Sequence, residues 1–227
     1  VVRARENDVR FGLMLFEGGS ICAPGEVDVA AAVGSADQIE LALSVYPNGG
    51  TPTAATLAAA RSAFDGAPPA PDGRAVVVVT DGAPNCNGTL DGSTCTCLVA
   101  LQADCVSMPE NCLDDEATIA QAQALNAAGT PVFVVRLPFS GSFAPVTDDI
   151  AAAGGTVAAY AADEPTAIGP AIDEAAVRIH ACRFDVPGAS TIAVAVDGTA
   201  VPRDPSRADG WELGDADTLE LFGDSCA

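Results

Sequence analysis

Lysine is missing from this sequence, and basic residues of any kind are few. All 10 basic residues are arginines, against 31 aspartates and glutamates, so the formal net charge is −21 at pH 7. A surface with this excess of negative charge repels phosphate groups. The composition therefore argues against nucleic acid and anionic lipid as partners.

Long apolar runs are missing as well. Apolar runs such as residues 75–79 and 131–135 fall far short of the roughly 18 residues that a membrane span needs, so no membrane span is expected. The sequence carries no signal peptide and starts at Val1 rather than Met, so we expect a mature product, cleaved or trimmed. Hydrophobic residues make up 49% and charged residues 18%, which is typical of a globular protein.

Cysteine, in contrast, is plentiful, with 8 residues. Five of them share one polar, Gly-rich segment: Cys86, Cys95, Cys97, Cys105 and Cys112. An even number of clustered cysteines favours disulfides in an exported protein. Structural zinc is the alternative, because Cys95 and Cys97 form a Cys-x-Cys pair. Zinc sites usually have two wider Cys pairs, however, and the single His180 is far from this cluster in sequence.

Predicted strands and helices alternate along the first 180 residues. The strands are 9–16, 75–79, 131–137 and 156–160, and the helices are 35–45, 53–64, 114–128, 148–153 and 165–180. The valine run at 75–79 shows no alternation, which predicts a parallel strand covered on both faces and central in the sheet. The sequence therefore predicts an α/β fold with an open, mostly parallel, Rossmann-like sheet flanked by helices.

The pattern changes at Cys182. Apolar residues then alternate, and Asp197-Gly198 follows one alternating run as a hairpin turn signal. We predict a main domain over 1–181 with a Cys-rich insertion at 85–113, and a small antiparallel β extension over 182–227. A disulfide between Cys182 and Cys226 is expected to close the extension, whereas the pairing of Cys22 with the five clustered cysteines stays open.

Two polar loops are the candidates for chemistry. Residues 49–53 (GGTPT) lead into a predicted helix, and residues 80–85 (TDGAPN) follow the valine strand directly. Ligands of open α/β sheets bind at the carboxyl ends of the strands. Asp81 and nearby hydroxyls are hard oxygen ligands, suited to Mg²⁺, Mn²⁺ or Ca²⁺.

Each of these residues also has a purely structural interpretation. Thr51 and Thr53 are good helix caps, and Asp81 with Gly82 can form an ordinary turn. The acidic residues at 114–116 stand at a predicted helix start. The helix dipole stabilises negative charge there, so this role is favoured over metal binding.

Together with the strand FGLMLF at 11–16, the two loops resemble the von Willebrand factor A (VWA) domain, in a bacterial, exported, Cys-containing form, from Val9 to about residue 181. The resemblance implies a metal-ion-dependent adhesion site (MIDAS). Thr51 and Asp81 would then be metal ligands, with Mg²⁺, Mn²⁺ or Ca²⁺ as the cation and residues 82–85 at the rim. A carboxylate from a protein partner would complete the metal shell.

The sequence departs from this family before Val9. The family's Asp-x-Ser-x-Ser metal-binding loop and the strand before it have no counterpart. In the family that strand lies between the strands that correspond to 11–16 and 75–79, and its absence leaves two open edges. We expect a cleaved N-terminal fragment or a neighbouring subunit to supply the strand.

The predicted function is extracellular adhesion or protein binding through a metal-bridged acidic ligand. The alternative is a structural subunit of a cell-surface or extracellular assembly with a degenerate metal site. An enzyme is not expected, because His180 has no Ser or Cys arranged with it for nucleophilic catalysis. The expected location is secreted, periplasmic or on the cell surface.

Overall fold

The computed structural model describes most of the chain. The described residues are 1–16, 22–44, 49–67, 70, 73–137, 143–162, 168–180, 183–186, 188, 191–206, 209–213, 218–222 and 225. They form two compact units. The larger comprises Val1–Ala70 and Arg74–Ala175, and the smaller comprises Pro71–Gly73 and Ala176–Ala227.

A parallel three-stranded sheet lies at the centre of the larger unit. Its order is β3 (Val76–Thr80), β4 (Val132–Arg136) and β5 (Tyr160–Ala161). The first four residues of β4 are buried, as their unbroken apolar run requires of a strand with neighbours on both edges and both faces. The predicted α/β fold with a parallel sheet is thus confirmed.

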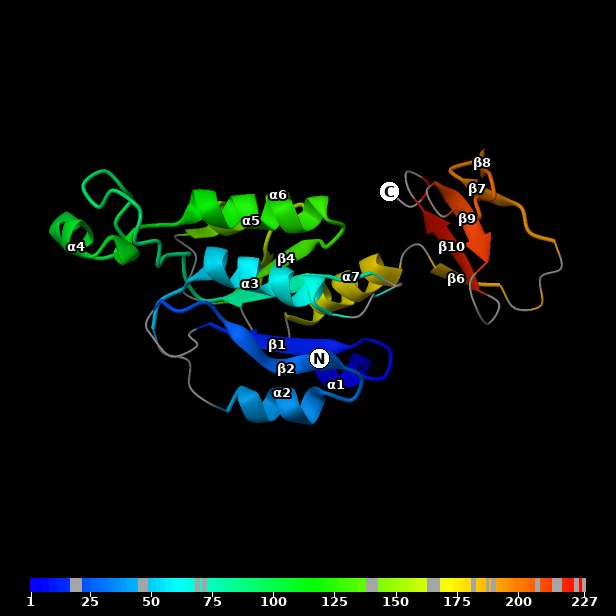
Figure 1. Cartoon of the computed structure of the whole chain (residues 1–227), viewed down its shortest axis with the longest axis horizontal. Coiled ribbons are helices and arrows are strands. Elements are labelled where there is room, and N and C mark those ends of the chain that lie inside the picture. Colours follow the sequence, from blue (N-terminus) through cyan, green and yellow to red (C-terminus); the bar gives the residue numbers. More distant parts are fainter. Residues whose placement is uncertain are drawn as a thin grey trace. The chain divides into compact units, whose positions relative to one another are not determined.

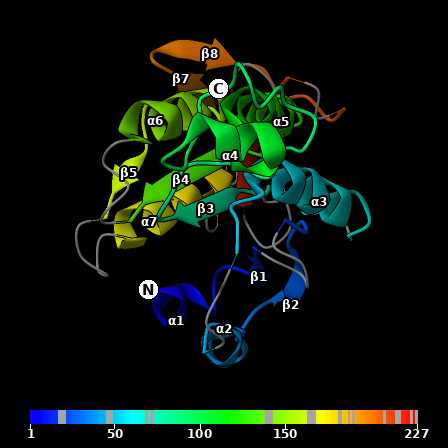
Figure 2. The same ribbon diagram turned by 90° about the vertical axis from the view of Figure 1, so that its left-hand side faces the viewer.

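Helices cover both faces of this sheet (Figure 2). Helices α3 (Thr53–Asp65), α5 (Asp115–Ala127) and α6 (Ala144–Ala153) pack on the face that carries Val78 and Val134. Helix α7 (Ile168–His180) packs on the opposite face, where Ala171 and Val135 share a buried cluster. Side chains alternate between the faces of a strand, so one valine run supplies both cores.

Two predictions about these strands are wrong. The valine strand β3 is not central, because β4 occupies the middle position of the sheet and, among the residues that the structure describes, β3 pairs with β4 alone. Of the predicted strand at 156–160, only the end forms a strand in the structure, as part of β5. The chain just after α6 bonds back to the helix instead. The N–H and the hydroxyl of Thr156 both donate to the carbonyl of Ala151.

The N-terminal part adds a second, antiparallel pair of strands. It contains α1 (Val2–Arg5), β1 (Phe11–Leu15), β2 (Glu26–Ala32) and α2 (Ala36–Ala42), and β1 pairs with β2 (Figure 1). The predicted strand at 9–16 and helix at 35–45 are confirmed in these elements. Ser35 precedes α2, but its hydroxyl donates to the carbonyl of Phe11 at 2.8 Å and does not cap the helix.

Disulfides hold the Cys-rich insertion, which contains α4 (Gln102–Ser107) and a 3-10 turn, η1 (Pro109–Asn111). The bonds are Cys95–Cys112, Cys97–Cys105 and Cys22–Cys86. The part of the chain that is described contains no free cysteine. Sulfur atoms of Cys95, Cys105 and Cys112 lie within 4.8 Å of one another, but all three are in disulfides, which supports the disulfide prediction over zinc.

The smaller unit is built from short antiparallel strands. They are β6 (Arg183–Asp185), β7 (Val194–Val196), β8 (Thr199–Val201), β9 (Gly210–Leu213) and β10 (Thr218–Phe222), with the sheet orders β6-β10-β9 and β7-β8. The predicted hairpin turn between β7 and β8 is confirmed, with positive φ at Asp197 and Gly198. Trp211 packs in the core of this unit. The predicted Cys182–Cys226 bond lies outside the described residues.

No described helix has the length and apolar character to cross a membrane.

Candidate functional site

The two polar loops from the sequence lie against each other in the larger unit. The N–H of Asn85 donates to the carbonyl of Thr51 at 2.9 Å. In return, the N–H of Thr51 donates to the side-chain Oδ1 of Asn85 at 2.6 Å. This reciprocal pair joins the loop before α3 to the loop after β3.

Thr51 and Asp81 are both at this contact. A Cβ atom built on Gly82 would lie 3.8 Å from the hydroxyl oxygen of Thr51, so that hydroxyl faces the backbone just after Asp81. Asp81 itself is exposed. Its carboxylate forms no hydrogen bond or ion pair with any residue that the structure describes.

Thr80 shapes the turn that presents Asp81. Its hydroxyl donates to the carbonyl of Gly82 at 3.0 Å, and the N–H of Gly82 lies 3.2 Å from the same hydroxyl oxygen. These local bonds agree with the turn interpretation of Asp81-Gly82. They leave the Asp81 carboxylate free, so the turn is compatible with a ligand role for Asp81.

Helix capping, in contrast, does not account for Thr51. The N-cap of α3 is Pro52, and no side chain caps this helix end. The hydroxyl of Thr53 donates to the carbonyl of Thr51 at 3.4 Å. The Thr51 hydroxyl is therefore not used by the helix.

A disulfide and a buried hydrogen bond fix the surroundings of the loops. Cys86 follows the Asp81 loop and is bonded to Cys22, and its backbone has φ +76°, which residues other than glycine rarely adopt. Its N–H donates to the carbonyl of Glu110 at 2.8 Å. Nearby, the N–H of Gly25 donates to the hydroxyl of Thr56 on α3 at 2.9 Å.

Asp114 ties the end of the Cys-rich insertion back to the site loop. Its N–H donates to the carbonyl of Pro84, and the Asn87 amide donates to its carboxylate at 2.8 Å. Burial raises the pKa of the Asp114 carboxyl above its usual value, although the Asn87 hydrogen bond acts in the opposite direction.

The other two residues of the acidic group at 114–116 belong to a helix start, as the structural interpretation predicts. Asp115 and Glu116 stand in the first turn of α5, where the helix dipole favours negative charge. The structure thus brings together Thr51, Asp81 and Asn85, and leaves the acidic group at 114–116 as a helix start.

Comparison with known proteins gives a likeness of fold. No family model matches the chain, and no curated protein matches it. A crystal structure of the pilus adhesin SpaC from Lactobacillus rhamnosus GG is similar to it, with a TM-score of 0.50 and 18% sequence identity. The similarity covers 99% of this chain and 34% of that chain, so this chain spans about a third of the adhesin's length. It concerns the fold alone, and membership of the VWA family stays a prediction.

Proposed function

We propose that this chain is an extracellular adhesion or protein-binding module. It binds an acidic group of a protein ligand through a divalent cation held by Thr51 and Asp81. The contact between the two loops carries the proposal, because the reciprocal Thr51–Asn85 bonds place a hydroxyl beside an exposed turn with a free carboxylate.

The donor atoms fit a hard cation. A carboxylate and a hydroxyl are oxygen ligands of the kind that Mg²⁺, Mn²⁺ and Ca²⁺ take, and Mg²⁺ keeps several waters when few protein ligands hold it. The ligand's carboxylate then displaces one of those waters. No catalytic role is proposed for any residue of the site.

The charge of the chain gives this arrangement a physical reason. A protein with net charge −21 repels an acidic ligand. A cation between Asp81 and the ligand's carboxylate turns that local repulsion into attraction. The three disulfides among the described residues are typical of proteins in oxidising compartments, which supports a secreted, periplasmic or cell-surface location.

A structural role in a cell-surface or extracellular assembly is the second candidate. It is favoured by the likeness of fold to a pilus adhesin and by strands β1 and β3, each of which pairs with one other strand among the described residues. In this case the metal site is degenerate, and partner binding does not depend on a cation.

Thermal unfolding with and without Mg²⁺ or Mn²⁺ tests the metal site. A cation that binds only the folded state at 100 times its Kd stabilises it by about 2.7 kcal/mol, which corresponds to a rise in Tm of about 5–10 °C for a chain of this size. The Asp81→Ala variant should lose this rise.

The matched control is Asp149→Ala, which removes the same charge from an exposed position on α6. This variant should keep the response to the cation. Equal responses in all three proteins would place the cation on other carboxylates and contradict the proposed site. Turnover of a substrate that disappears with Asp81→Ala would contradict the non-enzymatic role.

A further inference from the structure

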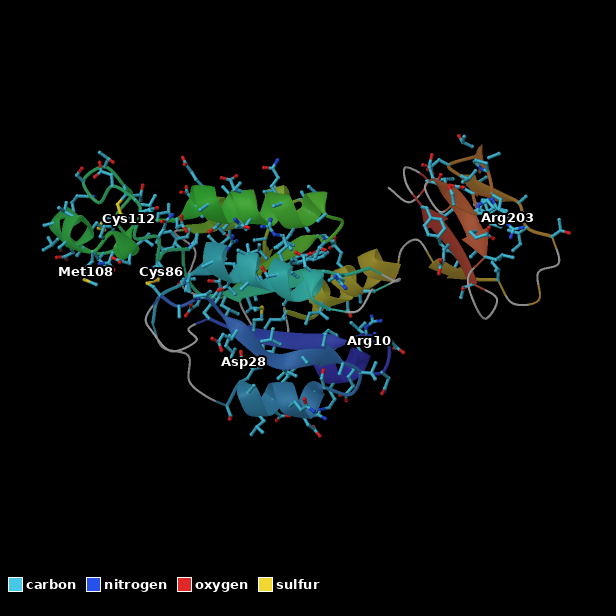
Figure 3. All side chains as sticks on the ribbon, viewed as in Figure 1. Arg10, Asp28, Cys86, Met108, Cys112 and Arg203 are labelled. Carbon is cyan, nitrogen blue, oxygen red and sulfur yellow. A yellow bond between two sulfur atoms is a disulfide. The ribbon has the colours of Figure 1, made fainter. Side chains whose placement is uncertain are left out.

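Two disulfides of the Cys-rich insertion meet in one cluster of sulfur atoms. Cys95 is bonded to Cys112, and Cys97 is bonded to Cys105. The sulfur atoms of Cys95, Cys105 and Cys112 all lie within 4.8 Å of one another. Figure 3 labels Cys112 within the insertion and Cys86 where the insertion begins. Four sulfur atoms from positions up to 17 residues apart therefore gather at one place.

Backbone hydrogen bonds bring the two ends of this cluster together. The segments that carry Cys97 and Cys112 form an antiparallel bridge. On one side of the bridge, the N–H of Leu98 donates to the carbonyl of Asn111 at 3.0 Å. On the other side a second backbone bond, at 2.9 Å, joins the same two segments. These bonds do not involve sulfur, so they favour the same arrangement of the cysteines when no S–S bond joins them.

Helix α4 brings Cys105 into the cluster from a third direction. Cys105 is 0% exposed. The side-chain amide of Gln102 donates to the carbonyl of Gly92 at 2.7 Å, which ties the start of α4 to the segment before Cys95. A Cβ atom on Gly92 would collide with the carbonyl oxygen of Cys105, so this close approach requires glycine.

The insertion has no apolar core that could hold it without its sulfur atoms. Within residues 85–113, all of which are described, the buried residues are Gly92, Cys105 and Cys112. Larger aliphatic side chains point outward, and Leu101 is 62% exposed. Small segments of this kind are held by disulfides or by a structural metal. The sulfur cluster is therefore the part of the insertion that determines its stability.

We infer that in the reduced protein, before the two S–S bonds form or after a dithiol opens them, the cluster binds one Zn²⁺ ion through four thiolates. The four ligands are Cys95, Cys97, Cys105 and Cys112. Zn²⁺ prefers thiolates, whereas Mg²⁺ and Ca²⁺ prefer oxygen ligands. The site is separate from Thr51 and Asp81 and does not need them, so this inference goes beyond the proposed function.

The spacing of the sulfur atoms fits a tetrahedral zinc site. With Zn–S distances of about 2.3 Å, the sulfur atoms of such a site are about 3.8 Å apart. Three of the sulfur atoms already lie within 4.8 Å of one another, so rotation of side chains brings them to this spacing. The insertion contains Asp91, Asp104 and Glu110 but no arginine, and this negative charge attracts a cation.

Zinc and the two disulfides exclude each other, because the same sulfur atoms form both. Two dithiol molecules open the two S–S bonds, and each becomes a disulfide while four cysteine thiols form. Zn²⁺ then replaces the four thiol protons. In the reverse direction, two molecules of an oxidising disulfide accept four electrons from the zinc-bound thiolates. Both S–S bonds form again, the oxidant leaves as four thiolates, and Zn²⁺ is released.

Cobalt(II) is the probe for this site, because tetrahedral Co²⁺ with thiolate ligands absorbs visible light and Zn²⁺ does not. The 227-residue protein is reduced with a phosphine in the absence of oxygen and titrated with Co²⁺. We expect one Co²⁺ per chain with the absorption bands of a four-thiolate site, and loss of these bands when Zn²⁺ is added. The oxidised protein should show none of these bands.

Cysteine variants identify the ligands. Cys97→Ser removes one ligand and should weaken Co²⁺ binding to the reduced protein by about 100-fold. The double variant Cys22→Ser/Cys86→Ser removes two thiols outside the cluster. Cys182→Ser/Cys226→Ser removes the two remaining ones. Both double variants should bind Co²⁺ with the affinity of the unchanged protein.

Hydrogen exchange separates a native site from thiols of a disordered segment. In the reduced protein without metal, the amides of α4 should exchange at least about tenfold faster than in the oxidised protein. One equivalent of Zn²⁺ should restore most of the protection, because the metal holds the same segments that the two disulfides hold. Asp81→Ala should give the same recovery.

Three results would overturn the inference. Absence of the four-thiolate bands in the reduced protein would show that the cluster binds no metal. Equal affinity of Cys97→Ser and the unchanged protein would place the metal on other thiols. Bands without recovery of protection in α4 would show that the metal binds a disordered insertion and that the native arrangement does not form the site.

Discussion

Asn85 joins the two loops that carry the candidate ligands. Its backbone and side chain both bond to the backbone of Thr51, 34 positions away in the sequence. The sequence places Thr51 and Asp81 in loops at one end of the sheet, because strand-end position follows from local pattern. It could not predict the Asn85 side-chain bond, which depends on the tertiary approach of the two loops.

Replacing Asn85 tests its role in holding the loops together. Asn85→Ala leaves the half-buried Thr51 N–H without its acceptor, and we expect a loss of about 1–3 kcal/mol in the free energy of unfolding, measured by urea denaturation. The site should also bind its cation more weakly, because Thr51 is no longer fixed beside Asp81.

Two further variants serve as controls for Asn85→Ala. Asn7→Ala makes the same chemical change at an exposed position and should stay within about 0.5 kcal/mol of the unchanged protein. Asn85→Asp keeps an acceptor oxygen and should lose less stability than Asn85→Ala. If Asn85→Ala and Asn7→Ala unfold alike, the Thr51–Asn85 bond does not stabilise the loops.

At the scale of elements, strands and helices could be predicted where their formation depends on their own residues. The apolar runs that became β3 and β4 and the Ala-rich segment that became α3 are recognisable from their own residues. The burial of a strand depends on its neighbours, which the run itself does not specify. The valine run therefore predicted a strand correctly and its central position wrongly, since β4 holds the middle position of the described sheet.

The disulfides close loops of very different length. Cys97–Cys105 closes a loop of 8 residues inside the insertion, and Cys22–Cys86 closes one of 64 residues that includes β2, α2, α3 and β3. In the chain-entropy model the short loop contributes about 2.5 kcal/mol and the long loop about 4 kcal/mol. The shorter bond constrains the insertion, whereas the longer bond holds the two sheets of the unit together.

Removing each disulfide separately should have different effects on proteolysis and on Tm. The double variant Cys97→Ala/Cys105→Ala should make the insertion sensitive to limited proteolysis and should lower the Tm of the larger unit less than removal of the longer bond does. Cys22→Ala/Cys86→Ala should lower that Tm, because it frees β1 and β2 from β3. Mass spectrometry of the fragments and calorimetry measure the two effects. Equal loss of Tm in both double variants would contradict this division.

At the scale of the whole molecule, negative charge exceeds what the arginines can neutralise. Described ion pairs join Arg3, Arg5, Arg136 and Arg203 to carboxylates, and Arg3 contacts both Asp37 and Glu40. Even complete pairing of the 10 arginines leaves 21 carboxylates over, because the chain has 31. Like charges at this density destabilise the compact state.

Monovalent salt should therefore stabilise the protein. Between 10 mM and 150 mM NaCl the screening length falls from about 30 Å to about 8 Å, which weakens repulsion across the molecule more than it weakens contacts within ion pairs. With a chelator present to remove divalent cations, we expect Tm to rise over this range. The rise should be the same with KCl and in Asp81→Ala, because screening is not specific to one carboxylate. A Tm that falls with salt would show that the surface ion pairs, and not the repulsion among excess carboxylates, dominate the electrostatic free energy of folding. Any stabilisation by Mg²⁺ that remains at constant ionic strength then belongs to a defined site.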